Sequence, residues 1–300
     1  MSLTRSYLRL HFIVFLWGFT AILGLLISIP AVEMVFLRTL LAAGGLGILL
    51  LVTHRPFKLA TTDYLPVILT GFIISAHWIT FFESARLSNA SVSLVGFATN
   101  SLWAALLEPW IKKRKIKWFE VALGFMVIIG LYIIFSFDFQ YKAGLLLGVI
   151  SGLLIAIFSV LNSGFVQRID PFTITFYEMI GATLCTALFF PVYLNLWAIQ
   201  GELNFDATSM DWMYIAILAI VCTVYAYSVA VDLLKQLSVF ILQLTFNLEP
   251  LYGIGMAVLI LGESEKMHFN FYIGTLVILS AVLSYPLLKR KFEPQSFPAQ

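Results

Sequence analysis

Six ionisable side chains lie deep inside long apolar segments of this 300-residue sequence, at Glu33, Arg38, His77, Glu178, Asp232 and Glu249. Arg38, His77, Glu178 and Glu249 are the four with a candidate role. An ionisable group in hydrocarbon is costly, so such residues face a cavity or a partner and often mark sites of ligand binding or proton movement. The four offer one cation, one imidazole and two carboxyls. They therefore suit the binding of charged groups of a solute and the exchange of protons.

Arg38 and Glu178 fall at matching distances from the starts of their segments, one in each half of the chain. In one interpretation each residue pairs locally and holds its helix in a bundle. In the other, Arg38 is a counter-charge for a substrate carboxylate or an element of a gate. Both interpretations stay open, and we treat the two residues as candidates for gating or structural charges.

Glu249 precedes Pro250, whose ring removes one backbone hydrogen bond and frees the carbonyl of Phe246. A free carbonyl beside a carboxylate suits a cation or a substrate ammonium, as in the broken helices of transporters. The alternative is a kink that only shapes packing, with Glu249 neutral or paired.

Aromatic and amide side chains supply the other candidates for a solute cavity. His77, beside Trp78, serves either as a hydrogen bond between helices or as part of the cavity wall. Gln243 and Asn247 share one helical face, where amides either join helices or contact a ligand. The candidate substrate-binding residues are Trp17, His77, Trp78, Asn100, Trp103, Tyr225, Tyr227, Gln243, Asn247 and Glu249.

The elements that must position these residues are transmembrane helices. Hydrophobic residues make up 61% of the chain and charged residues only 11%, against roughly 25% charged in soluble domains. Stretches of about 20 apolar residues, enough to cross about 30 Å of hydrocarbon, recur from end to end. We expect an all-α integral membrane protein with ten spans, near residues 9–29, 32–53, 63–83, 89–110, 117–136, 143–166, 172–196, 211–234, 237–261 and 270–289.

The basic residues predict the orientation of these spans. Fourteen of the eighteen Lys and Arg residues fall in connections on one side and three on the other, while Arg38 lies within a span. Basic loops stay in the cytoplasm. We therefore expect an even number of crossings in the cytoplasmic (inner) membrane, with both termini in the cytoplasm.

The two halves of the chain resemble each other weakly, as internal repeats do. Five spans per half is an odd number, so the second half must enter the membrane upside down, as in many secondary transporters. We expect a first repeat over residues 1–140, a second over 141–292 and a cytoplasmic tail over 293–300. The alignment matches Phe36 with Phe176, Asp63 with Asp211, and Asn100 with Asn247.

The segment from Asn247 resembles the closing helix pair of the EamA-type transporters of the drug/metabolite transporter superfamily. The likeness rests on a mid-helix proline, a Gly-Glu pair and a later glycine, here Pro250, Gly262, Glu263 and Gly274. The motifs LWGFTAIL and FLRTLLAA in the first two spans also resemble the family. The first half departs from it, with Trp103 at the proline position and Lys115-Ile116 at the Gly-Glu position.

The resemblance implies ten helices in two inverted five-helix repeats and the export or exchange of small metabolites. We expect a secondary transporter that exports an amino acid or similar neutral or zwitterionic solute by alternating access. A passive facilitator or channel is the alternative, and a membrane-embedded enzyme is a more distant one. A proton is a candidate coupling ion, and the protein is either a monomer or a homodimer.

The sequence points away from enzymatic chemistry. It contains no phosphate-binding G-x-x-x-x-G-K-[ST] loop and no HExxH zinc motif. Cys185 and Cys222 lie in apolar segments without metal-binding spacing, so we interpret them as small hydrophobic residues. We expect no cofactor, no metal and, from the net charge of +2, no nucleic-acid partner.

Overall fold

The structure is a computed structural model that describes residues 3–135, 141–196, 198, 201–249, 252–253 and 269–292. Every regular element in these residues is helical. The helices of the first half are α1 (Leu3–Gly18), α2 (Thr20–Leu26), α3 (Ala31–Val52), α4 (Thr61–Leu87), α5 (Ala90–Phe97), α6 (Asn100–Ile111) and α7 (Trp118–Phe135). Those of the second half are α8 (Lys142–Phe165), α9 (Pro171–Leu196), α10 (Ser209–Ala219), η3 (Ile220–Tyr227), α11 (Ser228–Leu233), α12 (Val239–Phe246) and α14 (Phe269–Phe292).

Eight helical runs in the described residues are long and apolar enough to cross a membrane. They match eight of the predicted spans to within a few residues, although the first begins near the N-terminus rather than at residue 9. The predicted span 117–136 corresponds to the 18-residue helix α7. Much of 237–261, including Pro250, Gly262 and Glu263, lies outside the described residues, so the count of ten remains a prediction.

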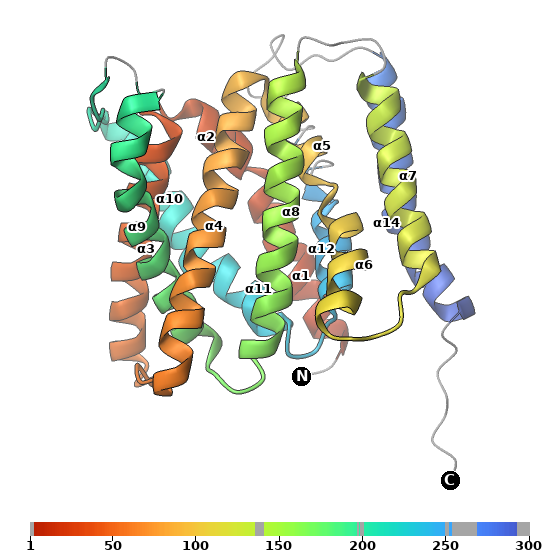
Figure 1. The fold of residues 1–300 in the computed structure, drawn as a ribbon, viewed down its shortest axis with the longest axis horizontal. Coiled ribbons are helices and arrows are strands. Elements are labelled where there is room, and N and C mark those ends of the chain that lie inside the picture. The colour runs from red at the N-terminus through yellow and green to blue at the C-terminus, as the bar shows by residue number, and fades with distance from the viewer. Residues whose placement is uncertain are drawn as a thin grey trace.

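The helices run roughly side by side in one bundle (Figure 1). α4 packs along both α8 and α9, so the two halves interlock at the centre instead of forming separate bodies. α7 lies beside α14 at one side of the bundle. The beginning of α1 and the end of α14 lie at the same end of the bundle (Figure 1).

Glycines allow the closest of these helix contacts. Gly148 on α8 lies against Gly96 on α5, where a β-carbon on Gly148 would be 3.1 Å from the Gly96 Cα. A β-carbon on Gly152 would lie 2.8 Å from the carbonyl oxygen of Phe97. With Gly144 against Ser84 and Ser88, these residues form a small-residue ridge that lets α8 approach α4 and α5.

Two spans are interrupted at equivalent places, one in each half. α5 begins after Asn89, whose side chain accepts from the Val92 amide at 2.9 Å. α12 begins after Ser238, whose hydroxyl accepts from the Ile241 amide at 3.3 Å. Both helices have eight residues and end in a short turn.

Counting residues from the two N-cap residues, Asn89 and Ser238, shows which positions of the two halves correspond in the structure. Helical structure resumes at Asn100 after the first break and at Glu249 after the second. Asn100 therefore corresponds to Glu249, two residues beyond the match with Asn247 that the sequence alignment suggested. The carboxyl of the second half thus has a neutral amide as its counterpart in the first.

The span that runs from α10 to α11 contains eight residues of π-helix, η3. A π-helix bonds each amide to the fifth residue before it, and such segments often occur at functional sites. The hydroxyl of Thr223 follows the same spacing and donates to the Leu218 carbonyl at 2.8 Å. The segment turns Thr223 and Tyr227 inward and leaves Tyr225 45% exposed.

Candidate functional site

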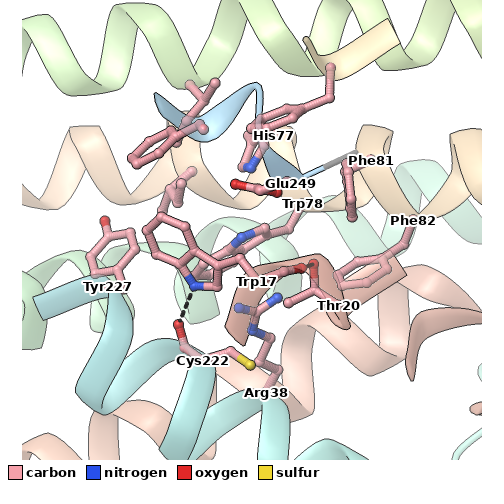
Figure 2. Close-up of a pocket in the computed structure, with 14 residues that line it drawn as sticks. Trp17, Thr20, Arg38, His77, Trp78, Phe81, Phe82, Cys222, Tyr227 and Glu249 are labelled. Atoms are coloured by element: carbon pink, nitrogen blue, oxygen red, sulfur yellow. Dashed lines mark hydrogen bonds between the residues drawn. The ribbon is translucent and has the colours of Figure 1, made fainter. Parts of the chain in front are cut away.

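A cavity lies inside the bundle, and both interrupted spans and η3 contribute to its wall. Figure 2 shows the residues that line it. Its empty space, mouth included, is about 490 Å³. The wall consists of Trp17, Thr20, Arg38, Ile74, His77, Trp78, Phe81, Phe82, Phe97, Ile155, Cys222, Tyr227, Phe246 and Glu249.

One face of α4 supplies the largest part of this wall. Ile74, His77, Trp78, Phe81 and Phe82 recur three and four residues apart, so they form one continuous stripe along the helix. The rings pack edge to face, with the Phe81 and Phe82 centroids 5.4 Å apart. This face gives the cavity an aromatic surface that suits the apolar part of an organic solute.

Arg38 brings a buried positive charge to the cavity. Its side chain is 2% exposed, and its Cζ lies 4.0 Å from the centroid of the Trp78 ring. Its Nε donates to the Thr223 hydroxyl at 2.9 Å. Among the described residues no carboxylate forms an ion pair with this guanidinium, so its remaining donors are available to an anionic group in the cavity (Figure 2).

Glu249 brings a carboxyl to the same cavity from just beyond the second helix break. The residue is 4% exposed, and no hydrogen bond to its carboxyl occurs among the residues that the structure describes. Figure 2 shows Glu249 beside His77 and Trp78, facing the cavity. A buried carboxyl without a protein donor is available to a cation or an ammonium group.

His77 is held by one side of its ring. Its Nδ1 lies 2.8 Å from the Ser151 hydroxyl and 3.1 Å from the Ser151 carbonyl oxygen on α8. Phe97 packs against the ring in a tilted arrangement, with 5.6 Å between centroids. His77 therefore joins two helices and lines the cavity as well, so both interpretations of this residue have a structural basis.

Four predicted cavity residues lie behind the wall. The Gln243 amide donates to Ser159 at 2.6 Å, and the Asn247 amide donates to Ser101 at 2.7 Å. Neither lines the cavity, and both join helices. The amide of Asn100 and the Trp103 Nε1 are also buried there, and neither has a hydrogen-bond partner in the described residues.

Tyr225 lies on the outside of the bundle. It is 45% exposed and its ring packs against Phe12 at 6.3 Å between centroids. Tyr227 is two residues further along and 4% exposed, and it lines the cavity. Two residues with this spacing point to different sides of a helix, so the cavity receives only one of the two predicted tyrosines.

Glu178 is fully buried but does not line the cavity. Its carboxyl accepts hydrogen bonds from Thr70 at 2.8 Å, Asn162 at 2.7 Å and the Tyr227 hydroxyl at 2.8 Å. It is therefore one side chain removed from the cavity, with Tyr227 between. The predicted local pairing consists of neutral donors instead of a cation.

A second, smaller cavity continues from the first toward the end of the bundle that holds both termini. The two share Trp17, Ile155, Tyr227 and Phe246 in their walls. Trp17 packs edge to face on Phe246 at 5.0 Å between centroids and donates from Nε1 to the Cys222 carbonyl at 3.0 Å. This aromatic constriction separates the two cavities.

We expect Trp17→Ala to open this constriction. An aromatic pair contributes about 1 kcal/mol beyond its buried area, so the open form becomes about fivefold more populated. In proteoliposomes the variant should release preloaded solute faster than wild type without solute on the other side. The control is Trp110→Ala, because Trp110 is 76% exposed. Equal leak from both variants would contradict the assignment.

Contacts between the first and second halves join the helices at both ends of the bundle. At the end with the termini, Arg9 of α1 pairs with Asp232 of α11 at 3.1 Å. At the opposite end, Asp211 of α10 accepts from the Ser28 amide at 2.8 Å and from its hydroxyl at 2.7 Å. These two sets of contacts hold the first half against the second at opposite ends of the bundle.

A further ion pair on the terminal side joins the α8–α9 connection to α4. Arg168 donates to the Asp63 carboxylate at 2.6 Å. This hydrogen bond raises the pKa of Arg168 above its usual value, so the cation is permanent. The pair fixes a loop and does not contribute to the cavity.

Several cavity residues escaped the sequence analysis. Phe81 and Phe82 follow His77 and Trp78 by four residues, so helical spacing alone could have identified them. Phe97 and Phe246 each close the helix before a break, which the sequence does not mark. Cys222, interpreted as a small hydrophobic residue, lines the cavity and holds Trp17 through its backbone carbonyl.

Comparisons with known proteins agree with this architecture. The sequence model of the EamA-like transporter family matches residues 5–136 and again 142–288, which is nearly the whole chain. No curated protein matches the sequence significantly. A solved structure described only as a crystal structure of a protein superposes with a TM-score of 0.72, over 97% of this chain and 100% of the other. At 16% identity, that likeness shows the fold alone.

Proposed function

The chain belongs to the EamA-like transporter family, and from this premise we propose that it exports a small zwitterionic solute, an amino acid or a related compound. The observation that carries the proposal is the pair of uncompensated groups in one aromatic cavity. Arg38 offers donors to a carboxylate, and Glu249 offers a carboxyl to an ammonium. A solute with both groups satisfies both residues at once.

Alternating access is the mechanism that we propose for this cavity. The cavity lies between the two halves, and inter-half contacts hold both ends of the bundle. Breaking the Arg9–Asp232 contact opens the side with the termini, and breaking the Asp211–Ser28 contact opens the other. The π-helical segment η3 borders the cavity and can absorb the accompanying shift in backbone bonding.

For the orientation, we propose both termini in the cytoplasm of a cell with the protein in its inner membrane. The support is the excess of basic residues in the connections on that side. In this orientation the second cavity and the Trp17 constriction face the cytoplasm. Cysteine labelling of single exposed positions in loops on either side, in intact cells, tests the assignment.

Solute flux into proteoliposomes tests the function directly. Purified protein should carry a subset of radiolabelled amino acids saturably, and unlabelled solute of the same type should compete. Flux that does not saturate would indicate a passive facilitator. The absence of flux for every amino acid would reject the proposed substrate class.

Glu249→Gln tests the ammonium site within the same assay. The substitution keeps the size of the side chain but cannot form a carboxylate with the ammonium. The half-saturating concentration of amino acid should therefore rise about tenfold or more, as expected for a charged hydrogen bond worth about 1.5–3 kcal/mol. Membrane abundance should stay unchanged. Glu202→Gln, in an exposed loop, is the matched control. Unchanged affinity in Glu249→Gln would reject the ammonium contact.

A further inference from the structure

Glu178 occupies an unusual position for a carboxyl in a membrane bundle. It is 0% exposed and meets a hydroxyl from α4, an amide from α8 and a phenol from η3. One oxygen, Oε1, accepts from Thr70 and Asn162, and the other, Oε2, accepts from Tyr227. The cavity does not contain it, so solute contact does not explain its retention at this depth.

The hydrogen-bonding groups around Glu178 can satisfy its carboxyl both with and without a proton. The Thr70 hydroxyl lies 2.8 Å from Glu178 Oε1 and 2.7 Å from the Val67 carbonyl oxygen, but it has a single hydrogen to donate. When the carboxyl is ionised, Thr70 donates to Glu178. When a proton sits on Oε1, the carboxyl donates to the Thr70 oxygen and Thr70 donates to Val67. Both protonation states therefore have a complete set of partners.

The charges on the surrounding helices leave the carboxyl without a fixed counter-ion. α4 contributes Thr70 and α8 contributes Asn162, both neutral, and η3 contributes the titratable Tyr227. α3 carries Arg38, whose guanidinium instead binds Thr223 and stacks on Trp78. In the described residues no cation pairs with Glu178, so loss of a proton changes the charge of the interior by one unit.

Tyr227 connects this carboxyl to the cavity. Its hydroxyl donates to Glu178, while its ring lines the cavity 5.9 Å from the Trp78 centroid. Tyr227 belongs to η3, and the same segment carries Thr223, which binds Arg38. The two ionisable groups therefore act on one π-helical segment, Arg38 through Thr223 and Glu178 through Tyr227.

We propose that Glu178 is the binding site of the coupling proton, and that η3 couples its protonation to occupancy of Arg38 by the solute carboxylate. The inference rests on the proposed transport function. A hydronium ion in the cavity gives up one proton and becomes water, and the proton passes Tyr227 to form an O–H bond at Glu178 Oε1. Release to a water molecule on the other side breaks that O–H bond and forms hydronium again. A solute carboxylate at Arg38 weakens or strengthens the hydrogen bond from Arg38 to Thr223. The change in this bond shifts the conformational equilibrium of η3, the segment that also carries Tyr227.

Flux against an imposed pH gradient tests the coupling. With one proton exchanged per solute, a gradient of one pH unit supports an accumulation of about tenfold in wild type. Glu178→Gln keeps the shape and acts as a permanently uncharged carboxyl, so it should exchange solute across the membrane but accumulate none. Tyr227→Phe removes the hydroxyl link and should behave in the same way. Glu202→Gln should accumulate solute as wild type does.

An infrared titration of purified protein tests the proton site without any solute. The difference between the wild-type and Glu178→Gln spectra removes the bands that other buried carboxyls, such as Glu249, give in both proteins. This difference should contain one band of a protonated carboxyl, and that band should fade as the pH rises. A difference spectrum without a pH-dependent carboxyl band overturns the assignment, as does gradient-driven accumulation in Glu178→Gln or none in wild type. If wild type carries no amino acid at all, the substrate proposal fails, and the infrared result alone decides whether Glu178 binds the proton.

Discussion

Replacing Arg38 with methionine is expected to raise the half-saturating concentration of amino acid at least about 30-fold. Methionine keeps most of the length of the side chain, so the packing against Trp78 largely survives while the charge is lost. Removing one partner of a buried charge pair costs about 2–5 kcal/mol, and 2 kcal/mol corresponds to about 30-fold in affinity. The measurement is concentration-dependent uptake into proteoliposomes, normalised to reconstituted protein.

The amine obtained by removing the carboxylate from a transported amino acid separates ligand contact from structure. If Arg38 binds the carboxylate, this amine competes equally weakly in wild type and in Arg38→Met. Arg38→Lys should fall between the two proteins, because an ammonium cannot reproduce the two-pronged hydrogen bonding of a guanidinium. An equal loss of amine and amino acid binding in Arg38→Met would mean that Arg38 only holds helices together.

The spans were predictable because membrane helices leave a strong signal in sequence. Apolar length and turn residues place eight runs within a few residues of their observed ends. The interruptions were not predictable, because α5 and α6 read as one apolar segment and the break after Phe97 contains no proline or glycine. The same holds for η3, whose π-helical bonding leaves no mark in residue type.

The ionisable residues of the site were predictable, because burying a polar or charged group in an apolar segment is costly and such residues stand out in the sequence. Arg38, His77 and Glu249 stood out as ionisable groups in apolar segments, and all three border the cavity. The same criterion selected Gln243 and Asn247, which face neighbouring helices instead. Which side of a helix faces a cavity depends on the packing of other helices, and a single sequence without clear periodicity does not contain that information.

Two glycines at the crossing of α4 and α9 let the two helices approach closely, and this approach sets the geometry of the proposed proton site. A β-carbon on Gly181 would collide with the Ile68 backbone, and one on Gly71 would lie 2.7 Å from the Ala182 nitrogen and also collide with the Glu178 carbonyl oxygen. This close backbone approach is what brings Thr70, the neighbour of Gly71, within 2.8 Å of the Glu178 carboxyl. The crossing thus determines the stability of the bundle and the geometry of its buried acid together.

Gly181→Ala is therefore expected to lower the stability of the bundle by about 3 kcal/mol or more, because the obstacle is backbone that cannot rotate away. Gly44→Ala is the matched control, since a β-carbon on Gly44 meets nothing within 4 Å and alanine favours a helix by about 1 kcal/mol. The measurement is the temperature at which half of the monodisperse protein is lost in detergent. Equal midpoints for both variants would mean that α4 and α9 can separate freely, and the contact between Thr70 and Glu178 would then lose its support.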